Sequence, residues 1–383
     1  GAWLGWVLDA FDFTVFLLVM PDIEAELGAG HLGTTASLAL TLLARLVGGY
    51  IAGLAADRFG RKTPLLVSIV WFALCDGAIA FAPSFGAVLV LRTLFGLGMG
   101  AEWTAGTTLA MESWPARSRG IASGVLQGSW AIGYLAAGLV AAFVVPRFGW
   151  RALFLVAAAP ALSVLFLRTY VPESDEWQHT RRNPPARRLP LPWRRLAWAS
   201  LLMTAGLGVY YALTGLYPTL LKTEQGLTHG AVAGLVALFN IGMMLGAVAV
   251  GTLASRRGVA LAIVAPALAC VPFLPLYVGL SPGLLGAGAF FAGATGAGVS
   301  GVVPLLLTQL FPAEQRARCV GIAYHVGAAG AAFIPMGIAA LAEGAGWSLA
   351  RSLASVAAIA LVTLALLAAR PPSRLPAVPA PIA

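Results

Sequence analysis

Charged residues are scarce in this sequence. Asp, Glu, Lys and Arg together make up 10% of the 383 residues, whereas an ordinary soluble domain has about 25%. This scarcity excludes a water-soluble globular protein, whose helices would need charged faces. Cysteine is also scarce, and Cys75, Cys270 and Cys319 lie within or at the ends of apolar runs without CxxC spacing. They therefore indicate neither disulfides nor a zinc site.

Apolar residues are abundant instead. Hydrophobic residues make up 59% of the chain, the mean hydropathy is +0.86, and apolar runs of about 20 residues recur from end to end. The pattern predicts an all-α membrane protein with 12 transmembrane helices, at about 1–20, 34–56, 63–82, 86–110, 118–145, 150–170, 197–221, 230–254, 259–280, 283–310, 318–341 and 347–369.

The longest polar interruption divides the predicted helices into six and six. We therefore expect an N-terminal six-helix bundle (1–170), a cytoplasmic middle loop (171–196), a C-terminal six-helix bundle (197–370) and a Pro-rich disordered tail (371–383). Because the chain begins with Gly rather than Met, we also expect the natural N-terminus to lie upstream.

Lys and Arg residues predict the orientation. Eighteen of the 24 fall in the loops on the side of the middle loop and both termini, and the opposite loops hold Arg147, Arg151, Lys222 and Arg351. By the positive-inside rule, both termini are cytoplasmic. Topology also accounts for the net charge of +9, since the basic residues form no single patch of the kind that binds nucleic acid. The Ala, Gly and Arg content favours a bacterial inner membrane.

Short motifs repeat in the two halves. The segment 53–62 (GLAADRFGRK) recurs in decayed form at 251–258 (GTLASRRG). Pro115-Ala116 with Arg119 and Gly124 recurs 197 residues later, as does Gly149-Trp150. Two six-helix halves in the same orientation predict a parallel internal repeat, with a central cavity that can open to either side.

These motifs resemble those of a known family. The GxxxDRxGRK segment, the pattern RTLFGLG at 92–98 and the duplication of six helices are similar to the Major Facilitator Superfamily of secondary transporters. Residues 5–13 (GWVLDAFDF), 98–103 (GMGAEW), 111–115 (MESWP) and 149–154 (GWRALF) resemble the sialate:proton symporter family, which includes sialic acid and lactate/pyruvate permeases. The resemblance implies transport by alternating access with protons as the coupling ion and no cofactor.

Seven ionisable residues fall inside predicted spans, where a charge costs at least about 2.5–3.5 kcal/mol. They are Asp9, Asp12, Arg45, Asp76, Arg92, Glu102 and His325. Asp12 and Arg45 both reach the middle of the membrane, and Asp9 shares a helix face with Asp12. They predict a cluster in which Arg45 anchors a substrate carboxylate and the two aspartates exchange protons. The alternative is a static buried ion pair.

Other buried ionisable residues extend the predicted proton route. The hairpin at 83–86 brings Asp76 and Arg92 to matched depth, which predicts an intramembrane salt bridge. The resemblance implies a coupling role for an Arg at this point of span four, and a structural clasp is the alternative. Glu102 is a candidate for an inner proton step or for a network with its neighbours. His325, beside Tyr324, is a candidate substrate donor or a neutral packing partner.

Neutral polar residues are candidates to complete the cavity. Their aromatic rings and polar tips suit a small oxygen-rich ligand, although the same residue types also serve as packing between helices. The candidates are Gln127, Trp130 and Tyr134 in span five, Tyr210, Tyr211 and Thr214 in span seven, and Asn240 in span eight.

The loop motif at 53–62 is a candidate for a role in conformational change. The resemblance implies a latch for the outward-open state, formed by Gly53, Asp57, Arg58, Gly60 and Arg61, with Glu112 and Arg119 as candidate partners. A basic loop that only determines topology is the alternative.

The sequence as a whole favours a proton-coupled symporter that takes up a small carboxylate, works as a monomer in the bilayer and binds no nucleic acid. Asp76 and residues 111–113 fit lactate-type permeases, whereas residues 210–219 lack the polar groups that those permeases have there. Proton-driven efflux of organic acids or amphipathic compounds is the alternative. A sensor or an enzyme is disfavoured because no long soluble segment and no HExxH, CxxC or P-loop spacing occurs.

Overall fold

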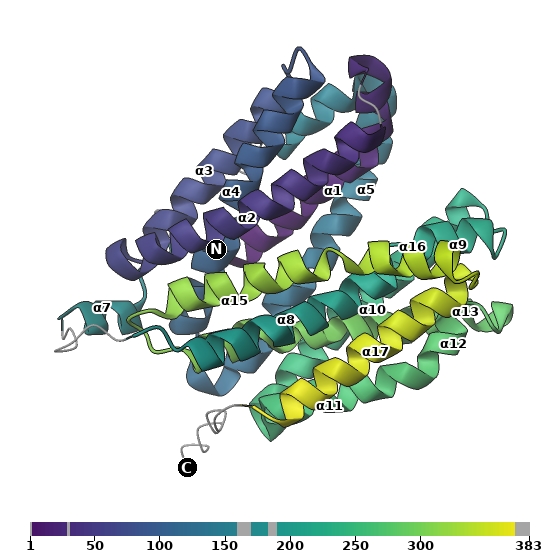
Figure 1. Ribbon diagram of the computed structural model, residues 1–383. Coiled ribbons are helices and arrows are strands. Elements are labelled where there is room, and N and C mark those ends of the chain that lie inside the picture. The colour runs from purple at the N-terminus through teal and green to yellow at the C-terminus, as the bar shows by residue number, and fades with distance from the viewer. Residues whose placement is uncertain (1, 29–30, 159–169, 183–189, 372–383) are drawn as a thin grey trace. The chain divides into compact units, whose positions relative to one another are not determined.

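The computed structural model describes residues 2–28, 31–158, 170–182 and 190–371, and every regular element in these ranges is helical (Figure 1). The α-helices of the first half are α1 (Ala2–Leu27), α2 (His31–Phe59), α3 (Lys62–Ile79), α4 (Phe85–Ser113), α5 (Arg119–Ala157) and α7 (Asp175–Arg182). The second half contains α8 (Trp193–Thr214), α9 (Tyr217–Thr223), α10 (His229–Arg257), α11 (Val259–Cys270), α12 (Leu274–Tyr277), α13 (Leu285–Phe291), α14 (Val303–Leu310), α15 (Arg316–Ala331), α16 (Ile334–Gly344) and α17 (Leu349–Ala369).

Eleven helical stretches in the described ranges are long and apolar enough to cross a membrane. Predicted spans five and six form one of these stretches, Ala116–Ala157. Gly149, with φ 74° and ψ 172°, interrupts its helical geometry at the predicted boundary because only glycine adopts this backbone conformation without strain. The rest of predicted span six and nearly all of the predicted tail lie outside the described residues.

The internal repeat is visible in the backbone. Gly60 and its counterpart Gly258 end α2 and α10 with φ of 104° and 92°, and the later pair, Gly149 and Gly346, has φ of 74° and 66°. These positive values occur at matching positions because each glycine ends or breaks a helix where a left-handed residue is needed.

Helix packing repeats as well. A side chain at Gly48 would collide with the backbone of Leu97, and at the equivalent Gly246 with that of Ala294. Likewise, Gly96 lies against Thr41 in the first half, and Gly293 lies against Phe239 in the second. The second and fourth helices of each half therefore approach each other at the same small residues, as a duplicated six-helix bundle requires.

The contacts divide the chain into two compact units. One contains Gly1–Ser113, Ser129–Leu191 and Phe311–His325, and the other contains Trp114–Gly128, Pro192–Leu310 and Val326–Ala383. Each unit thus takes one short segment from the opposite half of the sequence. The ionisable residues of the predicted spans, as well as the loop motif, belong to the first unit.

Candidate functional site

Arg45 of α2 and Asp9 of α1 form an ion pair inside the first unit. Arg45 Nη2 lies 3.8 Å from Asp9 Oδ2, and the side chains are 6% and 0% exposed. Arg45 Nε and Nη2 and both Asp9 oxygens make no hydrogen bond within the described residues. Two buried charged groups therefore keep hydrogen-bonding capacity that a ligand carboxylate or a proton can use.

Aromatic rings surround this pair. The Arg45 guanidinium lies 5.6 Å from the ring centroids of Trp6 and of Tyr324. Trp6 also lies close to Trp130, with centroids 4.9 Å apart, and Trp103 stacks on Tyr324 at 3.5 Å. An arginine among aromatic faces can bind a carboxylate while the rings stack on a flat, conjugated ligand.

His325 and Glu102 lie at the edge of the same site. The Nε2 atom of His325 is 3.1 Å from the Gly100 carbonyl oxygen and 3.3 Å from Thr104 Oγ1, and the ring is 2% exposed. Glu102 is 1% exposed and interacts electrostatically with Asp9 and Arg45. The structure therefore brings both residues to the Asp9–Arg45 pair.

Asp76 of α3 and Arg92 of α4 form the second buried ion pair, as the hairpin geometry predicts. Arg92 Nη1 lies 3.5 Å from Asp76 Oδ1, and both side chains are fully buried. The guanidinium lies 4.4 Å from the Phe16 ring centroid and 4.1 Å from that of Phe95. These rings hold the guanidinium through its faces, and its N–H groups make no hydrogen bond within the described residues.

Asp12 differs from the expectation that both aspartates face Arg45. Its charged neighbours are Asp76, Asp9 and Arg92. Asp9 therefore pairs with Arg45, whereas Asp12 interacts with Arg92. The reason is that residues i and i+3 are about 4.5 Å apart along a helix axis and about 60° apart around it. Asp12 is fully buried, and neither of its oxygens is hydrogen-bonded within the described residues.

The neutral candidates are placed in two groups. Trp130 belongs to the first unit with the ion pairs, as does Tyr134. The second unit contains Gln127, which is 5% exposed, together with Tyr210, Tyr211, Thr214 and Asn240. Of these, Thr214 Oγ1 donates to the Tyr210 carbonyl at 2.7 Å, and Asn240 Nδ2 donates to that of Val236 at 2.9 Å. These two side chains bond within their own helices.

Arg61 of the loop motif is fully buried and uses all five of its donors. It forms a bidentate pair with Glu112 at 3.0 and 3.1 Å, and donates to the Ala56 and Ala313 carbonyls and to Asp57. Asp57 in turn accepts from the backbone N–H groups of Ala317 and Arg318, both at 3.1 Å. The motif therefore caps the start of α15 within the first unit.

Glu112, which the sequence suggested as a partner of the loop motif, is shared by Arg61 and Arg316. Arg316 Nη1 lies 2.8 Å from Glu112 Oε1 and 2.5 Å from Glu176 Oε2. Arg119 is its repeat counterpart and belongs to the other unit, where its Nε donates to the Trp114 carbonyl at 2.8 Å. The repeat was the signal that could have identified Arg316.

Other members of the motif have varied surroundings. Gly53 lies so close to the backbone of Arg318 that a side chain would collide with it. Arg58 is exposed, with its guanidinium 5.1 Å from the Phe59 ring. Ser174 of the middle loop donates to Glu112 at 2.5 Å. The sequence carried no signal for this last contact, because it comes from a polar segment without a motif.

Substitution of Glu112 by Gln is expected to lower the free energy of unfolding by about 3 kcal/mol, because it removes the carboxylate that the buried Arg61 binds through two hydrogen bonds and leaves only the single ionic contact with Asp57 at 3.3 Å among the described residues. Thermal unfolding of the purified protein in detergent measures this loss. Glu176→Gln is the matched control, since Glu176 also binds Arg316 but its side chain is 31% exposed. We expect it to cost less than about 1 kcal/mol. Equal losses in the two variants would contradict the assigned role of Glu112.

Comparison with known proteins identifies transporters. Residues 2–285 match the family model described as Major Facilitator Superfamily. The sialic acid transporter NanX of Escherichia coli K12 is 29% identical over 347 residues, covering 88% of this chain and 84% of its own. The cis,cis-muconate transport protein of Acinetobacter baylyi is 31% identical over 369 residues, covering 90% and 86%.

A solved structure supports the same fold. The structure of the proton:xylose symporter XylE, bound to 6-bromo-6-deoxy-D-glucose, superposes with a TM-score of 0.78. It covers 96% of this chain and 93% of its own, with 18% sequence identity. The duplicated bundle, the eleven apolar stretches and this likeness agree on a transporter fold of 12 transmembrane helices.

Proposed function

The chain belongs to the Major Facilitator Superfamily, and from this premise we propose that it is a proton-coupled symporter that takes up a small, planar organic carboxylate by alternating access. It is a multi-pass membrane transporter for a small molecule. The observation that carries the proposal is the Arg45–Asp9 pair, which is buried, incompletely hydrogen-bonded and surrounded by aromatic rings.

Arg45 is the proposed carboxylate anchor. A guanidinium binds a carboxylate through two parallel N–H···O bonds, and Asp9 at 3.8 Å is close enough to compete for the same donors. Protonation of Asp9 would remove this competition and free Arg45 for the substrate. Proton binding and substrate binding would then favour each other, as symport requires.

The aromatic rings favour a planar acid. Trp6 lies beside Arg45, and Trp130 lies beside Trp6. Stacking on indole rings favours conjugated ligands over saturated ones. The relative from Acinetobacter baylyi is named for cis,cis-muconate, a conjugated dicarboxylate. The relative from Escherichia coli is named for sialic acid, whose ring is saturated. The two relatives therefore suggest ligands of different shape, and the aromatic side chains favour a planar, conjugated one.

The second ion pair completes the proposed proton route. Asp12 lies between the two pairs in electrostatic terms, since it interacts with Asp9 as well as with Asp76 and Arg92. We assign Asp9, Asp12 and Glu102 as proton acceptors and the Asp76–Arg92 pair as a coupling element. We assign substrate contact to the remaining polar candidates, which are Gln127, Tyr134, Tyr210, Tyr211, Thr214, Asn240, Tyr324 and His325. The loop motif with Glu112 and Arg316 is assigned to the conformational latch.

The direct test measures the external pH of de-energised, right-side-out vesicles that carry the protein. cis,cis-Muconate, gallate, lactate, pyruvate and sialic acid are added in turn. Symport takes up a proton with the substrate, so we expect the medium to become alkaline with a planar conjugated acid. Acidification would indicate exchange for protons and favour the efflux alternative. No response to any acid, from protein shown to be folded, would overturn the proposal.

A further inference from the structure

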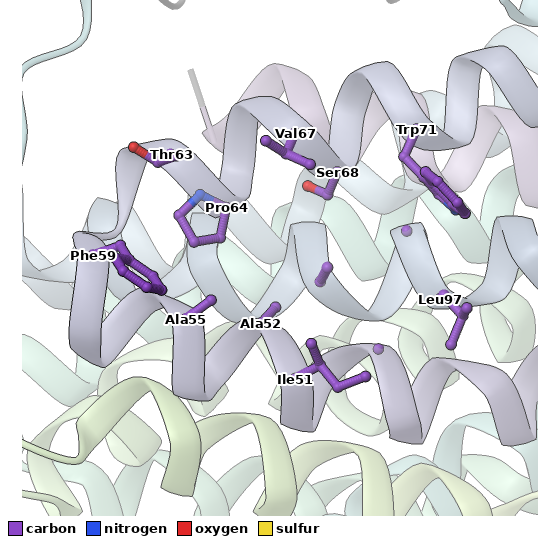
Figure 2. Close-up of a pocket in the computed structure, with 13 residues that line it drawn as sticks. Ile51, Ala52, Ala55, Phe59, Thr63, Pro64, Val67, Ser68, Trp71 and Leu97 are labelled. Atoms are coloured by element: carbon purple, nitrogen blue, oxygen red, sulfur yellow. The ribbon is translucent and has the colours of Figure 1, made fainter.

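An apolar groove runs between α2 and α3 in the first unit, separate from both ion pairs (Figure 2). Its volume is about 340 Å³. The floor is formed by α4 residues, including Leu97 and Gly98, and the walls carry Ala52 and Ala55 of α2. The groove exists because α2 packs closely on α4 at Gly48 while the facing residues of α2 and α4 are small.

The outer edge of the groove is exposed and apolar. Phe59 is 58% exposed, Val67 61% and Trp71 42%, and all three line the groove. Among the described residues, the hydroxyl side chains that line it are those of Thr63 and Ser68, and none of the lining side chains is charged. An opening of this composition suits the hydrocarbon of the bilayer, because a water-filled vestibule would require polar walls.

The length of the groove matches one leaflet. From Gly48 to Phe59, its wall on α2 spans twelve residues, and the eleven steps between them cover about 16 Å at 1.5 Å per residue. Half of the bilayer hydrocarbon is about 15 Å thick. The groove therefore extends from the end of α2 to about the middle of the membrane.

Basic residues flank the end of the groove where α2 meets α3. Arg58 is exposed and lies with its guanidinium 5.1 Å from the ring of Phe59, a lining residue. Lys62 is half-buried at the first residue of α3 and precedes the lining residues of that helix. The acidic neighbour, Glu173, accepts the backbone N–H groups of Arg61 and Lys62 at 2.9 and 3.1 Å. Arg58 and Lys62 thus lie on either side of the short turn between α2 and α3.

We propose that this groove binds one acyl chain of an anionic phospholipid from the leaflet on the side of the basic loops, with the lipid phosphate held by Arg58 and Lys62. The apolar walls accept the chain, and the depth of the groove fits a single leaflet. Two basic side chains at the membrane boundary provide selectivity for a negative headgroup. The site is separate from the proposed substrate site, and lipid binding to it can be measured without transport.

Trp71 reports on the occupant, because it lines the groove and its indole N–H is held by the Leu94 carbonyl at 2.8 Å. The full chain is placed in phosphatidylcholine nanodiscs that contain increasing fractions of phosphatidylglycerol with brominated acyl chains, which quench indole fluorescence. The Trp71 signal is the difference between the protein and its Trp71→Phe variant. We expect quenching to saturate at a mole fraction about tenfold lower than with brominated phosphatidylcholine.

Two pairs of variants separate the acyl chain from the headgroup. Ala55→Phe fills the groove and is expected to remove the saturable quenching, whereas Ala78→Phe, at an exposed position of α3 outside the groove, is expected to retain it. Arg58→Gln with Lys62→Gln is expected to abolish the headgroup preference. Arg256→Gln with Arg257→Gln removes the same charge from exposed positions of α10 and is expected to leave the preference intact.

Three results would contradict the lipid site. Quenching that rises in proportion to the mole fraction of either lipid would show ordinary annular contact and overturn the proposal. So would an equal loss in the Ala55 and Ala78 variants, or in the two charge variants. Circular dichroism and thermal unfolding of each variant show that it is folded, so a loss of quenching reports on the lipid.

Discussion

Vesicles that carry the Asp12→Asn variant are expected to show no substrate-dependent uptake of protons. Asp12 is fully buried and interacts with Asp9, Asp76 and Arg92, so it links the two ion pairs. A carboxyl group can gain and lose a proton, and an amide of the same size cannot. We therefore expect the alkalinisation by a planar acid to fall to the level of vesicles without the protein.

A second measurement distinguishes lost coupling from lost transport. Exchange of labelled for unlabelled substrate across the membrane needs no net proton movement, and we expect Asp12→Asn to keep it. Asp22→Asn is the control, because Asp22 lies on the same helix and is exposed. Normal proton uptake in Asp12→Asn would remove Asp12 from the proton route, and loss of exchange as well would assign it to substrate binding or to folding.

The buried ion pairs were predictable in part because charges inside apolar runs are rare and must find partners. Asp76 lies seven residues before Pro83 and Arg92 lies six residues after Gly86. These nearly equal distances from the turn bring the two side chains to the same depth and into contact. Depth places Arg45 level with Asp12, and the shared helix face brings Asp9 close to the same arginine. The assignment of Asp12 to the second pair did not follow, since a rotation of about 60° around the axis of α1 decides which arginine it meets, and depth carries no information on rotation.

The repeat made the fold predictable and the latch only partly so. Gly60 and Gly149 have positive φ values close to those of their counterparts Gly258 and Gly346, because the duplicated sequence preserved the backbone requirement. The partners of Glu112 were harder to predict. Arg316 is 204 residues away in the sequence, and Ser174 and Glu176 belong to a middle loop that has no hydrophobic periodicity from which to predict their positions.

Substitution of Arg45 by Gln is expected to weaken binding of a planar carboxylate about 30-fold or more, because loss of one member of a buried charged pair costs about 2–5 kcal/mol. Arg45→Lys keeps the charge but loses the fork of parallel donors, so we expect an intermediate loss. Fluorescence is a direct measure of binding, since Trp6 lies beside the guanidinium. Arg147→Gln is the control, because Arg147 is exposed and donates to the Phe143 carbonyl.

A loss of folding would mimic a loss of binding, since Arg45→Gln leaves the buried Asp9 without its ionic partner. The double variant Arg45→Gln with Asp9→Asn removes both charges, so it is expected to recover most of the thermal stability. If Arg45 anchors the substrate, the double variant still fails to bind the acid, because no guanidinium is present. If Arg45 only neutralises Asp9, removing both charges restores affinity, and that result would place the carboxylate anchor elsewhere in the protein.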